Sequence, residues 1–250
     1  MSKVKHLRTV MFESLPEYIR DGLVLWLDGE ESLITKEAED GTTITVWNDR
    51  VINGQYAEVG GALKSEDALA FDGTNSRGEL SKTGTVVLSG ILKGLKERTL
   101  EIVCKLNNTT DVQVFMLGEG NTATPEIGAA GLWYRPASGG VKVGTWDNSP
   151  IVIVQNVTER ASYSIVYGDT DLEDFNCYQN GVLCTKGEIA GNMYSEANAI
   201  GARLKTDGAT WQYRLCGEIC CIRVYNRKLT DTERAKNLEI DKRRFAINAG

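Results

Sequence analysis

Three short segments of the chain combine aromatic side chains with polar neighbours, a combination that suits sugar recognition. An aromatic ring can stack on the apolar face of a sugar, while amides and carboxylates bind its hydroxyl groups. Such rings predict a glycan site if they are exposed at a loop rim, whereas buried rings are simply part of the core, where tryptophan is usually found. The candidate glycan-binding residues are Trp133, Tyr134, Trp146, Asp147, Asn148 and Trp211.

An acidic run at residues 169–174 carries oxygen ligands of the kind that calcium prefers. Its candidate ligands are Asp169, Asp171 and Asp174. The run does not fit the EF-hand template, because its sixth position is Asp174 rather than glycine and its twelfth is Asn180 rather than glutamate. The sequence therefore predicts no cofactor, and a calcium ion held by loop carboxylates and carbonyls stays an open alternative.

The sequence offers little for hydrolytic catalysis. A glycoside hydrolase needs two carboxylates, about 5–5.5 Å apart for retention or about 6.5–9.5 Å apart for inversion. The i, i+2 acidic pairs fall in turn-like stretches or in a helical segment, and they are Glu37/Glu39, Asp171/Glu173, Asp231/Glu233 and Glu239/Asp241. The sole histidine, His6, lies in a polar N-terminal stretch, which argues against most His-based nucleophiles and metal sites. We expect a protein that is not an enzyme.

The six cysteines are interpreted as free thiols. No C-x-x-C pair supports a zinc site. Cys177 and Cys184 face each other across a predicted hairpin and could form a disulfide, but in a reducing compartment they are expected to pack as small apolar side chains.

Composition narrows the class of protein further. The chain has 250 residues and a net charge of -6, which argues against a nucleic-acid partner. No run approaches the ~18 apolar residues that span a membrane, so we expect no membrane insertion. The basic start is followed by an apolar stretch that stops at Glu13, too early for a signal peptide. We expect a protein made, and kept or assembled, in a cytoplasm.

Apolar residues alternate along most of the chain, which predicts half-buried β-strands. In residues 99–106 the alternation places Leu100, Ile102, Cys104 and Leu106 on one face. The other alternating segments are residues 42–47, 162–167 and 218–225. With frequent turn signals and no alternating helices, the pattern predicts an all-β, antiparallel two-sheet sandwich or barrel.

The firmest local prediction is a type I′ hairpin at Asn180-Gly181. Its register pairs Gln179 with Val182, Tyr178 with Leu183 and Cys177 with Cys184.

One short C-terminal helix is predicted to begin at Thr230, because Thr230 and Glu233 form a capping-box pattern. Its expected buried stripe consists of Ala235, Leu238 and Phe245. The basic residues 242–244 favour a solvated helix end, and a binding patch is the alternative.

The strand pattern starts only near residue 21, which divides the chain into residues 1–20 and residues 21–250. We interpret residues 1–20 as a docking arm, because they contain many apolar side chains and several cations. Folding of the arm back onto its own sandwich is the alternative.

A family resemblance rests on five segments. They are residues 21–28 (DGLVLWLD), 69–73 (LAFDG), 99–106, 178–181 (YQNG) and 217–230, with its G-x-I…R-x-Y-N-R-x-L-T pattern. In this order they resemble concanavalin A-like and laminin G-like jelly rolls, over about residues 22–247. The C-terminal segment 237–245 is similar to phage structural proteins and prophage relatives. The resemblance implies two sheets of six or seven strands.

The resemblance also implies alternatives for function. Some relatives bind glycans, often with calcium, and others only mediate assembly. Family hydrolases carry an E-x-D-x-E strand, which this sequence lacks. We expect a non-catalytic virion protein for glycan attachment or particle decoration, with cell-surface glycans, other virion proteins or further copies of itself as partners. The alternative is a polysaccharide-cleaving glycoside hydrolase on the same fold.

Overall fold

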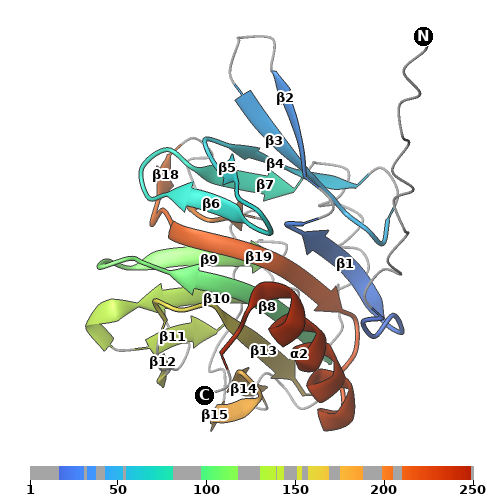
Figure 1. The fold of residues 1–250 in the computed structure, drawn as a ribbon. Coiled ribbons are helices and arrows are strands. Elements are labelled where there is room, and N and C mark those ends of the chain that lie inside the picture. The colour runs from blue at the N-terminus through green and yellow to red at the C-terminus, as the bar shows by residue number, and fades with distance from the viewer. Residues whose placement is uncertain are drawn as a thin grey trace, which may run out of the picture.

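The alternating segments become the strands of two antiparallel sheets that pack face to face (Figure 1). The structure is a computed structural model, and it describes residues 17–30, 33–37, 43–52, 55–80, 97–117, 130–138, 140–143, 151–153, 157–168, 175–187, 199–204 and 210–248. The predicted all-β sandwich with a C-terminal helix is confirmed.

The sheet that the helix covers, called here the helix-side sheet, has eight strands within the described residues. In spatial order they are β15 (Val182–Gly187), β14 (Phe175–Gln179), β13 (Ala161–Tyr167), β8 (Arg98–Leu106), β19 (Cys216–Tyr225), β6 (Leu69–Asp72) and β5 (Leu63–Lys64), with β1 (Leu23–Asp28) also paired to β19.

The opposite sheet has nine strands within the same ranges. They are β12 (Ile151–Ile153), β11 (Gly140–Val143), β10 (Ala130–Arg135), β9 (Val112–Leu117), β16 (Ala199–Ile200), β7 (Arg77–Leu80), β4 (Tyr56–Gly60), β3 (Thr43–Asn48) and β2 (Leu33–Glu37). Both sheets exceed the expected six or seven strands, because very short strands such as β5 and β16 extend or complete them. A 3-10 turn, η1 (Pro136–Ser138), joins β10 to β11, and β17 (Arg203–Leu204) pairs with β18 (Trp211–Gln212) as a separate small hairpin.

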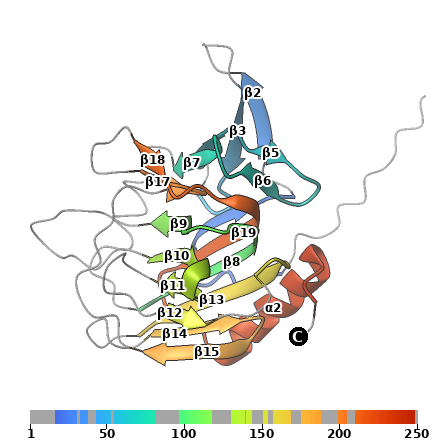
Figure 2. The same cartoon turned by 90° about the vertical axis from the view of Figure 1, so that its left-hand side faces the viewer.

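The two faces of the helix-side sheet are buried in two different cores. Leu100, Ile102, Cys104 and Leu106 of β8 face the main core between the sheets, as predicted. Val103 on the other face packs in a second core beneath the helix α2 (Asp231–Phe245). Figure 2 shows α2 on the outer side of this sheet, on the far side of the molecule from the β17–β18 hairpin. Strand β8 is therefore buried on both faces rather than on one.

The hairpin β14–β15 has the predicted turn but not the whole predicted register. Asn180 and Gly181 adopt φ angles of 51° and 85°, as a type I′ turn requires. Gln179 pairs with Val182 and Tyr178 with Leu183, which confirms two of the three predicted pairs. A register shift next to Cys177 places that residue opposite Thr185, so the predicted pairing of Cys177 with Cys184 is wrong. All six cysteines are free thiols.

The helix begins as predicted but buries a different face. Thr230 and Glu233 form both hydrogen bonds of a capping box. Of the predicted stripe only Phe245 is buried, whereas Ala235 is exposed and Leu238 is half-buried. The buried residues are Arg234, Asn237, Ile240, Asp241 and Phe245. The stripe prediction was wrong because the sheet beneath presents charged and polar partners, which apolar periodicity does not reveal.

The end of the predicted arm is part of the fold. Tyr18 is 2% exposed and packs edge-on against Trp26, with ring centroids 5.4 Å apart. The backbone amide of Ile19 donates a hydrogen bond to Oδ1 of Asn237 in the helix at 3.0 Å. Tyr18 and Ile19 of the predicted arm therefore contact the sandwich and its helix, which agrees for these residues with the alternative of an arm folded back onto its own domain. Residues 1–16, the rest of the arm, lie outside the described residues.

Candidate functional site

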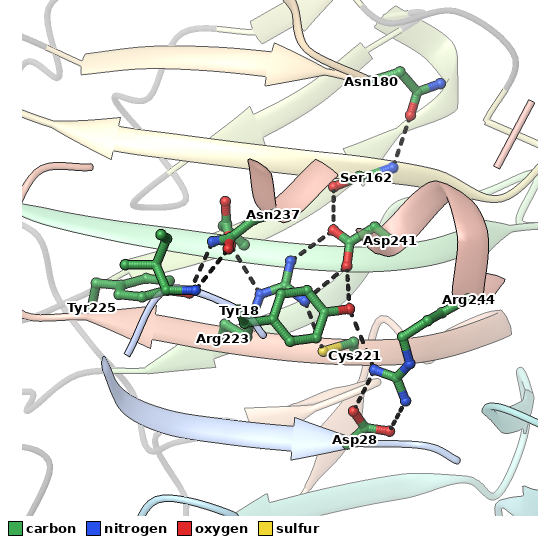
Figure 3. A network of polar contacts seen from close by, with 12 residues as sticks. Tyr18, Asp28, Ser162, Asn180, Cys221, Arg223, Tyr225, Asn237, Asp241 and Arg244 are labelled. Carbon is green, nitrogen blue, oxygen red and sulfur yellow. Dashed lines mark hydrogen bonds and ion pairs between the residues drawn. The ribbon is translucent and has the colours of Figure 1, made fainter. Parts of the chain in front are cut away.

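Two polar clusters stand out among the described residues, and the first is a buried network between α2 and the helix-side sheet (Figure 3). Arg223, which has no exposed surface, donates from Nε to Glu101 at 2.9 Å and from both terminal nitrogens to Asp241 at 2.8 and 2.7 Å. Asp241 also accepts hydrogen bonds from the hydroxyl groups of Tyr18 at 2.8 Å and Ser162 at 3.1 Å.

Further contacts close this network. Asn237 Nδ2 donates to Glu101 at 2.8 Å and to the Tyr225 hydroxyl at 3.0 Å. Arg244, from the basic helix end, contacts both carboxylate oxygens of Asp28 at 2.7 and 2.9 Å. Arg244 therefore forms a largely buried ion pair, so the helix end is only partly the solvated one that the sequence favoured.

The pKa shifts of the charged groups in this network indicate a structural role. Burial raises the pKa of Glu101, although Arg223 opposes the shift. Burial alone would lower the pKa of Arg223, but the carboxylates of Asp241 and Glu101 hold it well above its usual value. Because these groups are buried and bonded to each other, they offer no position for a substrate. The network stabilises the helix against the sheet.

The second cluster is an open groove of about 580 Å³ at the end of the sandwich near β18. Its walls come from the turn after β6, the segment between β8 and β9, and the segment between β18 and β19. The lining residues are Asp72, Gly73, Asn107, Asn108, Thr109, Thr110, Asp111, Gln212, Tyr213, Arg214 and Cys216. They include amides, hydroxyls, carboxylates, a guanidinium and an aromatic ring, all groups that bind sugars.

Hydrogen bonds hold the groove walls in place. The side chain of Asn108 donates to the carbonyl of Arg214 at 2.9 Å and accepts from the amide of Cys216 at 2.8 Å. Tyr213 has a φ of 51°, an uncommon value for a bulky residue, and its carbonyl accepts from the amide of Gln113 at 3.0 Å. Its ring packs edge-on against Trp133, with centroids 5.9 Å apart. The wall is thus fixed before any ligand binds.

The two carboxylates of the groove already have partners. Oδ1 of Asp72 accepts hydrogen bonds from the amides of Thr74, Asn75 and Ser76 at 2.8–2.9 Å and from the Ser76 hydroxyl at 2.7 Å. Burial works to raise the pKa of Asp72, but these hydrogen bonds together hold it well below its usual value. Asp111 pairs with Nε of Arg135 at 3.0 Å.

The residues predicted to bind glycans differ in where the structure places them. Trp133 and Tyr134 are 2% and 8% exposed, so their rings belong to the core and cannot stack on a sugar. Trp133 instead supports the groove from behind through Tyr213. Trp211 is half-buried next to the groove residue Gln212, and the guanidinium of Arg77 lies 5.5 Å from its ring centroid. Trp146, Asp147, Asn148 and the calcium candidates Asp169, Asp171 and Asp174 lie outside the described residues.

Several groove residues carried a weak sequence signal that the motif search did not use. Residues 107–111 form a polar run directly after a buried strand, where a binding loop is common. Arg77 and Arg214 carried no signal, because they come together only in the folded chain. Among the described residues no group of three or more His, Cys, Asp and Glu side chains is arranged to hold a metal ion. No helix in those ranges is long and apolar enough to cross a membrane.

Similar architecture occurs in known structures. No family model and no curated protein matches the sequence. A Trypanosoma rangeli sialidase in complex with a difluoro-KDN matches with a TM-score of 0.59 and 15% identity, over 89% of this chain and 33% of that chain. The same sialidase with 2,3-difluorosialic acid gives 0.58 and 15%, over 92% and 36%. The binding domain of botulinum neurotoxin serotype D/C gives 0.55 and 10%, over 87% and 52%.

These likenesses concern the fold. The chain spans about a third of the length of the sialidase and about half of the toxin binding domain. At 10–16% identity the shared feature is the arrangement of strands. The chain is a two-sheet antiparallel β-sandwich with the architecture found in parts of these proteins.

Proposed function

We propose that this chain is a non-catalytic, glycan-binding protein of a phage virion, with a jelly-roll domain of the concanavalin A-like or laminin G-like kind. In this proposal the groove beside β18 binds a cell-surface glycan, for attachment or as part of particle decoration. The observation that carries the proposal is the composition of the groove, which joins amide, hydroxyl and guanidinium groups to an aromatic side chain. The virion assignment rests on the sequence resemblance of the C-terminal segment.

The fold neighbours support a binding role. One of them is a botulinum neurotoxin binding domain, and one sialidase structure is in complex with 2,3-difluorosialic acid. Fold likeness alone does not assign function, so the proposal rests on the residues of the groove.

The state of the carboxylates supports a non-catalytic role over a glycoside hydrolase. A glycosidase acid needs a raised pKa so that it carries a proton at neutral pH. Asp72 in the groove has a lowered pKa, and Asp111 is paired with Arg135. Asp49 and Glu101 do have raised pKa values caused by burial, but they lie outside the groove and are held by internal hydrogen bonds.

A glycan array of bacterial surface polysaccharides and host-type oligosaccharides tests the binding proposal. We expect the protein to bind a defined subset of glycans. Trp211→Ala removes the ring beside the groove residue Gln212, and the double variant Asn107→Ala/Gln212→Ala removes two amides of the groove. Each should weaken this binding at least about tenfold. Ile34→Ala, at an exposed apolar residue on β2, is the control and should bind normally.

Two results would overturn the proposal. Binding to no glycan on the array, or binding that the groove variants leave unchanged, would remove the groove as a glycan site. Release of reducing sugar from any of these polysaccharides, lost in Asp72→Asn or Asp111→Asn, would show that the protein is a hydrolase.

A further inference from the structure

Building on the proposed glycan-binding function, we infer that the groove selects sugars that carry a carboxylate, which Arg214 and Arg77 bind together. Arg214 lines the groove, and its guanidinium donates to the backbone carbonyl of Asn75 at 3.3 Å. Arg77 is exposed on β7, above the ring of Trp211. Within the described ranges neither guanidinium forms an ion pair with a carboxylate, unlike Arg135, which pairs with the groove residue Asp111.

The protein's own acids near the groove are already engaged. Asp72 exerts an attraction on Arg214, but its Oδ1 is held by the turn that follows β6. Asp111 is paired with Arg135. Arg214 and Arg77 therefore keep their charge-assisted hydrogen bonds available for a ligand.

Two contacts bring the segments of these arginines together. Arg214 donates to the carbonyl of Asn75, two residues before Arg77, and the guanidinium of Arg77 lies 5.5 Å from the ring centroid of Trp211, three residues before Arg214. Their positive charges therefore repel each other. Burial, and next the positive charge of Arg77, lower the pKa of Arg214. An anion bound between two like charges would relieve this repulsion. A guanidinium presents a planar fork of donors that matches the two oxygens of a carboxylate, which favours a carboxylated sugar as the ligand.

Backbone hydrogen bonds at Arg214 and Leu215 fix the position of Arg214 in the groove wall. Its carbonyl accepts from the side chain of Asn108, and the next amide, of Leu215, donates to the carbonyl of Gly201 at 2.7 Å. The volume of about 580 Å³ lies within the usual range of small-ligand sites. Amides and hydroxyls around Arg214 remain to bind the neutral part of the sugar.

Titration calorimetry with two matched pairs of sugars tests the inference. The pairs are trigalacturonate against galactotriose, and 3′-sialyllactose against lactose. In at least one pair, we expect the acidic sugar to bind at least about tenfold more tightly than its neutral partner. A difference of this size is what one charge-assisted hydrogen bond contributes. Arg214→Gln should abolish this preference, as should Arg77→Gln, an exposed change that serves if the first variant folds poorly. Arg243→Gln, at the exposed helix end, is the matched control and should leave the preference intact.

The outcomes separate this inference from the function on which it rests. Equal binding of neutral and acidic sugars, or a preference that survives both arginine variants, would overturn the inference and leave glycan binding in place. Binding of none of these sugars and of no array glycan would overturn the proposed function, and the inference with it. Higher salt should weaken the binding of the acidic sugars alone.

Discussion

Arginine side chains in this protein have two different roles, and the extent of their burial distinguishes the two. Arg223 has no exposed surface and meets two carboxylates, so its charge is neutralised inside the fold. Arg214 borders an open groove and contacts a carbonyl. The same side-chain type thus stabilises the helix in one place and, in our proposal, binds a ligand in the other.

The buried network predicts a large and local effect on stability. Asp241→Asn removes one of the two charges that balance Arg223 and places an amide beside the guanidinium. Breaking a buried ion pair in this way should lower the free energy of unfolding by about 3–5 kcal/mol. Urea denaturation measures the loss. Glu239→Gln, which breaks the exposed pair with Lys242, should cost below about 0.5 kcal/mol, and an equal cost for both variants would contradict a structural role for the network.

At the scale of elements, local signals were sufficient where the partners are close in sequence. The capping box and the Asn180-Gly181 turn form as predicted, because each depends on neighbouring residues. The buried face of α2 was not predictable from apolar spacing, since Asp241 is buried by pairing with Arg223 on β19. The groove was also missed, because its walls come from three segments that are far apart in the sequence and meet only in the folded chain. Trp133 was misinterpreted because a tryptophan with polar neighbours in sequence can still face the core.

The helix cap predicts a pH dependence of stability. Hydrogen bonds from the side chain of Arg227 lower the pKa of Glu233 from 4.5 to about 2. Burial opposes this shift, and hydrogen bonds from Thr230 add to it. A lowered carboxyl pKa gives stability that is fully present above about pH 4.5 and is lost as the pH falls towards 2. Glu233→Gln should therefore be less stable than the parent chain at pH 7, with the difference shrinking towards pH 2.

Urea midpoints at pH 7, 4 and 2.5 measure this difference, with Glu239→Gln as the control at an exposed helix position. A gap between Glu233→Gln and the parent chain that stays constant or widens on acidification would show that the carboxylate of Glu233 does not stabilise the cap.

For the molecule as a whole, the proposal of a docking arm now concerns residues 1–16, because Tyr18 and Ile19 contact the sandwich and its helix. Deleting residues 1–16 leaves Tyr18 in its site, so the melting temperature should change by less than about 2 °C, while self-association or attachment to a particle is lost. Tyr18→Ala should instead lower the melting temperature by about 6 °C or more, because it empties a buried site under the helix.

Differential scanning calorimetry and light scattering measure both properties. A large fall in the melting temperature of the truncated chain, as a monomer, would mean that residues 1–16 stabilise their own sandwich and are not a docking arm.

The location of a bound sugar on the protein shows directly whether the groove is the glycan site. The ¹⁵N-labelled protein is titrated with galactotriose and with trigalacturonate, and the shifted backbone amides are mapped by NMR. We expect the shifts to centre on residues 107–111 and 212–214 around the groove. Shifts centred elsewhere, such as on the β14–β15 hairpin or α2, would contradict the groove as the binding site, and so would the absence of shifts with these sugars and with every glycan of the array.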